Sequence, residues 1–500
     1  MFYLYIIFFI LTGYFLAQTI VKKLPQHNSL SLALSPLFGS IIPFLILISL
    51  NTLHIPFSSH SLLLPWITIS LILLIKERLA FKNLIKNSLS SFKAENTFTK
   101  IIFIIIVLGI IQFISHAAIM PIRAGDGHGH WGSRVVDWIL NEKIQDGFFM
   151  QNPLNIIKEI VANYPLFHYL EMISSVIALP MLPAQSIKLS DLTNSLAIIF
   201  TAFFFLKFLA WKNIRAFIAA TLIFFAQRGL VMFIGSGYAE VNLNYYSFLI
   251  FSLLVYAITP IHSGYSTCSS LRCSGHSWQS NNSSINISFI LIGITAGVMS
   301  ITKNEGLYRF IILLVPFHIF MYRRPLPIKN YIWMFAFILL FKGINKLGSP
   351  TNGNYNEYID SIVLTSQHLK SQLPIALKAI YYSITKSDGL LKTSYLWSIP
   401  LSLIGIIYFW FSPSNWMPII RTQLAIFYLN FMFSILPIYI TLQPIVCNIN
   451  DGFGLGTNVL YRLNFQSSTF LFMSLLMMGQ LFLTNTNRFR FFSLDKNIVS

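Results

Sequence analysis

The chain has 500 residues, of which 55% are hydrophobic and only 10% are charged. Soluble domains carry about 25% charged residues, so this composition excludes a water-soluble surface of this size. The net charge of +18 sits mostly in short loops, where Lys and Arg fix membrane topology, and we therefore predict no nucleic-acid partner. The apolar residues form blocks of roughly 17–20, the length that crosses a bilayer as a helix. The predicted class is an all-α polytopic membrane protein.

The apolar blocks predict about 13 transmembrane helices. The first block follows Met1 without a basic region or a small-residue cleavage site, which predicts a retained helix and not a signal peptide. In chain order, we expect helices at residues 2–20, 33–50, 61–76, 101–120, 192–210, 216–234, 241–260, 286–302, 306–322, 330–345, 395–411, 422–441 and 466–484.

Lysines between residues 77 and 100 predict a basic cytoplasmic loop. From that anchor the later basic clusters alternate to the same side, which predicts an inner-membrane protein whose basic loops face the cytoplasm. The apolar segment 166–182 breaks this alternation, so we expect an interfacial or re-entrant helix there. The polar stretches then all fall on the outer face: 121–165, 235–240, 303–305, 346–394 and 442–465.

This alternation divides the chain into four parts. Residues 1–100 form an N-terminal segment of three helices with the basic loop, and residues 101–345 form a membrane core with the first large outer loop at 121–165. Residues 346–394 form a second outer loop, and residues 395–500 form the C-terminal membrane helices.

The first outer loop contains Asp126 within a glycine-rich run that ends at Trp131. Glycines let the backbone turn sharply, and partial burial at the membrane boundary would make a carboxylate a stronger base. The alternative is a solvated aspartate in a glycine-rich turn. His128 and His130 are weaker candidates for a divalent-cation site with Asp126.

Tyr164 precedes a proline and fits an interfacial helix start, whether or not it binds a ligand. Glu240 begins an apolar block, where an acid is costly and indicates a role or a partner. The alternative is a helix hairpin with an interfacial acid.

Lys303 and Glu305 interrupt two apolar blocks, and Arg462 precedes the last one. Lysine and arginine bind phosphate, which makes Lys303 and Arg462 candidates for holding a lipid-linked phosphate. The alternatives are a self-satisfying hairpin cap and a snorkelling arginine. The pair Gly293 and Gly297 predicts close helix packing.

In their order these motifs resemble those of the multi-pass GT-C glycosyltransferases, which include the protein O-mannosyltransferases and the lipid A aminoarabinose transferase. The resemblance runs from about residue 100 to 484. It depends on Asp126 with Trp131, Tyr164-Pro165-Leu166, Gly237-Tyr238-Ala239-Glu240, Thr302-Lys303-Asn304-Glu305-Gly306 and Arg462.

The resemblance implies transfer of a sugar from a polyprenyl-phosphate donor to an envelope glycan, lipid or protein acceptor in the periplasm. Asp126 would be the general base, and Lys303 and Arg462 would bind the departing phosphate. Glu240 and Glu305 would orient these groups. The chain departs from the family in having Glu240 where aspartate is usual and in placing three helices before the core.

Two other functions fit a multi-pass protein. An O-antigen polymerase or ligase normally needs several arginines in its large outer loop, whereas residues 346–394 contain none. A secondary transporter predicts polar residues at mid-membrane and repeat symmetry. The depth of the acids distinguishes these functions, because acids at the outer boundary favour transfer chemistry.

Overall fold

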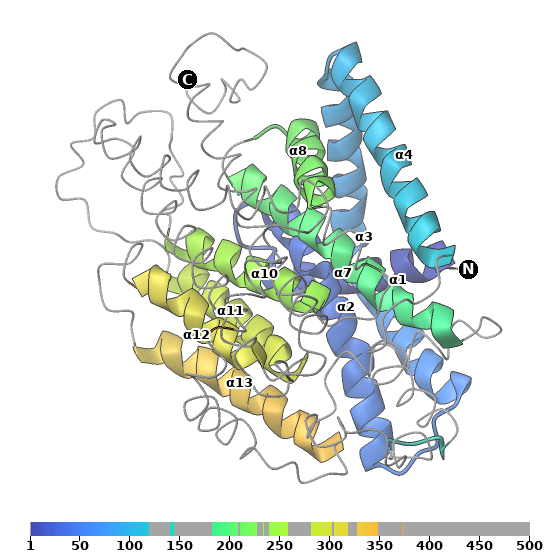
Figure 1. Cartoon of the computed structure of the whole chain (residues 1–500), viewed down its shortest axis with the longest axis vertical. Coiled ribbons are helices and arrows are strands. Elements are labelled where there is room, and N and C mark those ends of the chain that lie inside the picture. The colour runs from blue at the N-terminus through green and yellow to red at the C-terminus, as the bar shows by residue number, and fades with distance from the viewer. Residues whose placement is uncertain are drawn as a thin grey trace.

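A computed structural model describes residues 2–119, 141–144, 183–208, 211–227, 234, 240–258, 282–302, 305–318, 328–348 and 374. Within these ranges the regular structure is ten helices and no strand, so the predicted all-α class is confirmed for this part of the chain (Figure 1). The helices are α1 (Phe2–Val21), α2 (His27–Thr52), α3 (Ser59–Ala94), α4 (Thr97–Ile119), α7 (Pro183–Phe208), α8 (Asn213–Ala226), α10 (Glu240–Ile258), α11 (Asn282–Thr302), α12 (Glu305–Pro316) and α13 (Ile328–Gly348).

The largest departure from the predicted helices is α3. It does not end near residue 76 but continues through a kink at Glu77 (φ −107°, ψ 17°) to Ala94. The expected basic loop is therefore mostly helix, because its Leu, Lys and Ala residues favour helix even where the segment is not apolar enough to span a bilayer. Asn96 begins the next helix by accepting a hydrogen bond from the Thr99 amide at 2.8 Å.

Helix α2 forms the centre of the bundle and packs against α1, α3, α7 and α13. Its contact with α1 depends on two glycines. A Cβ atom on Gly13 would lie 1.8 Å from the Ser35 carbonyl oxygen, and one on Gly39 would lie 2.7 Å from the Phe9 carbonyl oxygen. The two backbones therefore touch, which only glycine permits.

Helices α11 and α13 make a second close contact, and it confirms the packing role predicted for Gly293 and Gly297. A Cβ on Gly293 would lie 2.9 Å from Met334 Cα, and one on Gly297 would lie 2.7 Å from Phe341 Cδ2. By contrast, a Cβ on Gly343 of α13 would meet nothing within 4 Å. The spacing of four residues brings both glycines onto one face of α11.

Hydrogen bonds between helices show which helix ends lie together at one end of the bundle. Gln26 Nε2, just before α2, donates to the Lys207 carbonyl near the end of α7 at 3.0 Å, and the Tyr256 hydroxyl near the end of α10 donates to the Pro25 carbonyl at 2.9 Å. Lys22, Lys207 and other basic residues thus gather at one end of the bundle, called the basic end below. The grouping of helix ends expected from charge is present among the described helices, and their membrane sides stay a prediction.

Two described helices, His27–Thr52 and Thr97–Ala117, are long and apolar enough to cross a membrane. Length and apolar character alone do not establish a span, because core helices of soluble proteins share them. The expected total of about 13 spans stays a prediction.

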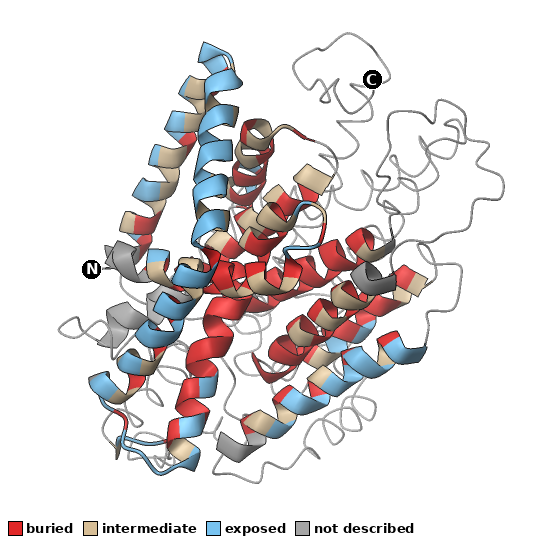
Figure 2. Cartoon of the chain, turned by 180° about the vertical axis from the view of Figure 1, so that it is seen from behind, coloured by how far each residue is buried: buried red, intermediate tan, exposed pale blue. Residues whose placement is uncertain are grey.

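Helices α3, α4 and α13 nevertheless carry long exposed stretches, pale blue in Figure 2, and many of their exposed residues are aliphatic. Leu64, Ile105 and Leu339 are 67%, 61% and 70% exposed. A soluble monomer rarely exposes such continuous apolar surface.

Candidate functional site

Most of the residues predicted for the site lie outside the described ranges. These are Asp126, Trp131, Tyr164, Lys303 and Arg462, together with the weaker metal candidates His128 and His130. The apolar segment 166–182 and nearly all of the loop 346–394 lie outside them as well. Within the described residues, no group of three or more His, Cys, Asp or Glu side chains is arranged to hold a metal ion.

The structure places the other two candidates at helix starts. Glu240 is the first residue of α10, and Glu305 is the first residue of α12. Acidic residues are stabilised at helix N-termini by the partial positive charge of the exposed amides. This local effect accounts for both positions without a ligand, so a role in binding must be argued from what surrounds the two helix starts.

These two helix starts lie at the same end of the bundle, opposite the basic end. The Tyr246 hydroxyl of α10 lies within hydrogen-bonding reach of Ser40 on α2 and Thr302, the last residue of α11. The Ser247 hydroxyl contacts Met299 Sδ at 3.7 Å. The start of α12 packs against the same residue, since a Cβ on Gly306 would lie 1.9 Å from the Met299 carbonyl oxygen. The end of α11 and the start of α12 thus pack against α10.

Buried polar side chains line this end of α10. Asn194 of α7 donates a side-chain hydrogen bond to Asn242 of α10, and the two residues are 2% and 1% exposed. Together with Tyr246, Ser40 and Thr302 they form what we call the polar layer. Asn242 Nδ2 makes no hydrogen bond within the described structure, and a buried unsatisfied amide group costs about 1–3 kcal/mol. A hydroxyl-rich ligand would satisfy such a donor.

Arg309 is a charged residue that the sequence analysis did not select. It lies one helical turn after Glu305 on α12 and is fully buried, on the same face as Phe310 and Leu313, whereas Tyr308 and Ile311 are exposed. A buried guanidinium is costly unless hydrogen bonds and countercharges compensate it. The signal was present in the sequence, because an arginine inside the apolar block 306–322 is itself an indication of function.

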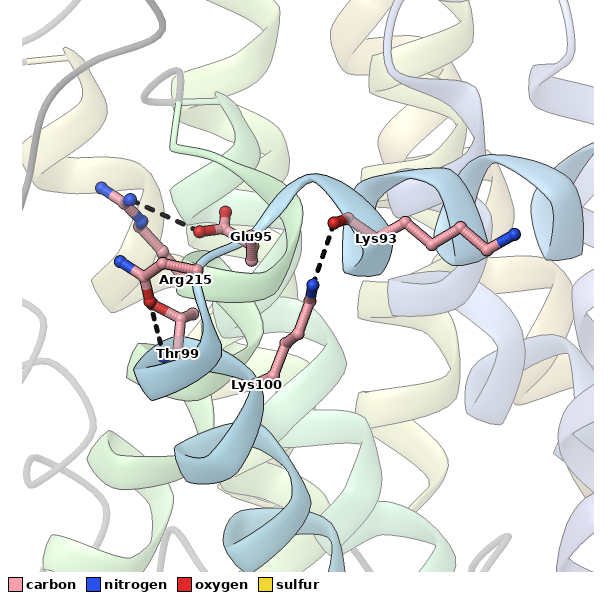
Figure 3. Close-up of polar contacts among 6 residues, drawn as sticks. Lys93, Glu95, Thr99, Lys100 and Arg215 are labelled. Atoms are coloured by element: carbon pink, nitrogen blue, oxygen red, sulfur yellow. Dashed lines mark hydrogen bonds and ion pairs between the residues drawn. The ribbon is translucent and has the colours of Figure 1, made fainter.

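The basic end is organised differently, by ion pairs between helices. Arg215 of α8 pairs with Glu95 at 3.4 Å, just before the start of α4 (Figure 3). In the first turn of α4, Lys100 Nζ donates to the Lys93 carbonyl oxygen at 3.0 Å. Asn213 Nδ2 also donates to Ser91 Oγ at 2.8 Å. These contacts fix the α3–α4 hairpin to α8, which is a structural role.

No known protein-family model, curated protein or solved structure matches this chain.

Proposed function

We propose that this chain is a membrane-embedded glycosyltransferase that moves a sugar from a polyprenyl-phosphate donor to an envelope acceptor. The observation that carries the proposal is the packing of α10 against the end of α11 and the start of α12. Ser247 of α10 contacts Met299 of α11 at 3.7 Å, and Gly306 at the start of α12 packs against the backbone of the same Met299. The helix starts that carry Glu240 and Glu305 therefore belong to one end of the bundle, which is what a shared site would require.

The exposed surface supports the membrane part of the proposal. Of the most apolar 18-residue stretch of α4, only 11% of the residues are buried. Water would make that surface a strong site of aggregation, whereas lipid would solvate it. A lipid-linked donor then reaches the site from within the bilayer.

The distribution of charge supports transfer chemistry over transport. Among the described acids, Glu240 and Glu305 begin helices, Glu77 and Glu95 lie at the basic end in ion pairs, and Glu142 is exposed, whereas Asp191 lies in the first half of α7. A transporter would place acids near the middle of the membrane. In the proposed reaction Asp126 takes the proton of the acceptor hydroxyl, and Lys303 and Arg462 bind the departing polyprenyl phosphate, with a divalent cation as a possible addition at His128 and His130.

The test uses full-length protein in nanodiscs with a panel of radiolabelled polyprenyl-phosphate sugars and envelope acceptors. We expect transfer by the wild type and a loss of at least about 100-fold in Asp126→Asn, the lower range for removing a general base. Glu240→Gln and Glu305→Gln should also lower the rate. The matched control is Glu95→Gln, the same substitution at the basic end. Because it breaks the ion pair with Arg215, transfer is measured per amount of folded, monodisperse protein, and that specific rate should be unchanged.

Each outcome has a distinct meaning. Transfer that survives Asp126→Asn but is lost in Glu240→Gln or Glu305→Gln would assign the base to that glutamate. Equal losses in Glu95→Gln and in the other variants would show a folding defect and remove the support for a site. Absence of transfer with every donor would contradict the proposal and favour a ligase or a transporter.

A further inference from the structure

The second half of α3, residues 78–94, carries an exposed row of cations. Arg78, Lys82, Lys86 and Lys93 are all exposed. The first three are spaced by four residues, which places them on one face of the helix, and Lys93 falls on the same side. We call these four residues the cationic stripe.

No acidic side chain offsets the stripe on the exposed surface of this helix. The two acids that bracket it, Glu77 and Glu95, have side chains only 9% and 8% exposed. Each of them is turned to a cation from another helix or turn, Lys22 at 3.8 Å and Arg215 at 3.4 Å. The positive charge of the stripe is therefore left uncompensated and directed outward.

The same ion pairs fix the stripe in place. Glu77 joins the start of the segment to the end of α1, and Glu95 joins its end to α8, with Asn213 and Ser91 adding a hydrogen bond. The segment is thus held against the basic end at both of its ends. A helix held in this way presents its charges in fixed positions. An anionic surface can therefore bind the helix without the entropy cost of ordering it first.

Exposed aliphatic side chains stand among the cations. Leu79, Ile85 and Leu89 are 68%, 45% and 56% exposed. A helix with lysines and aliphatic residues on its free surface is typical of the boundary between headgroups and acyl chains. A nucleic acid would leave these three side chains in water.

We propose that residues 78–94 form an interfacial helix that binds the anionic headgroups of the bilayer in which the protein is embedded. The inference rests on the proposed membrane function. It is supported by the continuity of the helix, because the preceding half of α3 exposes Leu71, Ile72 and Ile75. The chain passes directly from a face suited to acyl chains to a face suited to phosphates.

The test measures the binding of phosphatidylglycerol and of phosphatidylcholine to the full-length protein in detergent micelles by native mass spectrometry. A cation near an anionic lipid surface contributes roughly five-fold in affinity. We therefore expect Lys82→Gln with Lys86→Gln to weaken phosphatidylglycerol binding on the order of 25-fold, with phosphatidylcholine binding unchanged. High salt should reduce the preference of the wild type for phosphatidylglycerol.

The matched control is Lys23→Gln with Lys329→Gln, two exposed lysines at the same end that lie outside the stripe. An equal loss in this control would show an effect of net charge and overturn the proposal. A wild type without preference for phosphatidylglycerol would also overturn it. Incorporation of the wild type into nanodiscs is scored separately: failure to incorporate would contradict the proposed membrane function, whereas incorporation without lipid preference would contradict the stripe alone.

Discussion

Helices α2 and α4 are similarly apolar, yet they occupy opposite environments. Of the most apolar 18-residue stretch, 89% of the residues are buried in α2 and 11% in α4. The difference lies in side-chain size: α2 contains Ser31, Ala33, Ser35, Gly39 and Ser40, all buried, whereas α4 is mainly Ile and Phe. Small side chains allow helices to approach closely. Between these two helices, the small residues accompany the central position and the large ones the peripheral position, although α10 is buried with large side chains such as Tyr245, Phe248 and Leu249.

The largest effect is expected from enlarging a glycine at the centre. Gly13→Val would drive its side chain into the Ser35 carbonyl of α2, and we expect a loss of about 3 kcal/mol or more in the free energy of unfolding, at the upper range for overpacking. The measurement is the thermal midpoint and the monodisperse fraction of purified protein in detergent.

The control for Gly13→Val is Gly109→Val in α4, where a Cβ would meet nothing within 4 Å. It should change stability by less than about 1 kcal/mol. If Gly109→Val were as harmful as Gly13→Val, the contrast between the two helices would fail, and α4 would have a protein partner on its exposed face.

A smaller effect is expected from probing what α4 faces. Ile105 is 61% exposed, and we expect this surface to meet lipid. In a background with Cys268, Cys273 and Cys447 changed to Ser, a membrane-impermeant maleimide should label Ile105→Cys in nanodiscs at least about 10-fold more slowly than Lys86→Cys, because an apolar environment disfavours the thiolate. Equal labelling rates would place α4 in water and contradict the membrane proposal.

The smallest effect concerns the polar layer. Asn194→Leu and Asn242→Leu should each destabilise the protein, with a coupling energy of roughly 0.6–1.7 kcal/mol in a double-mutant cycle, the range for polar pairs between membrane helices. Gln112→Leu in α4 is the control and should be neutral, because Gln112 is exposed. Additive effects of the two asparagine changes would mean that their hydrogen bond does not hold α7 to α10.

The sequence predicted which helix ends lie on the same side of the bundle better than it predicted the length of each helix. The positions of the basic residues predicted which ends gather together, because short charged segments settle on one side of a bundle. The predicted loop at residues 77–100 was largely wrong, since 77–94 continues α3. Hydropathy measures how readily a segment enters lipid, whereas helix formation depends on backbone propensity. A helix that contains several lysines therefore has low hydropathy and is mistaken for a loop.

In the candidate site, too, some residues could be found from the sequence and others only from the structure. Glu240 and Glu305 were selected because an acid beside an apolar block is costly. Arg309 was missed, because one arginine does not change the apolar character of the block 306–322 that contains it. Its complete burial is a property of how α12 packs against α10 and α11.

The sequence by itself therefore determined the helical class, the basic end and the close-packing glycines of α11, because these depend on local composition and spacing. Only the tertiary structure decided that α2 is central and α4 peripheral, that Ser247 contacts Met299, and that Glu77 and Glu95 turn inward to leave the cationic stripe uncompensated. Each of these facts joins residues far apart in the chain, and no local pattern specifies which helix a side chain will meet.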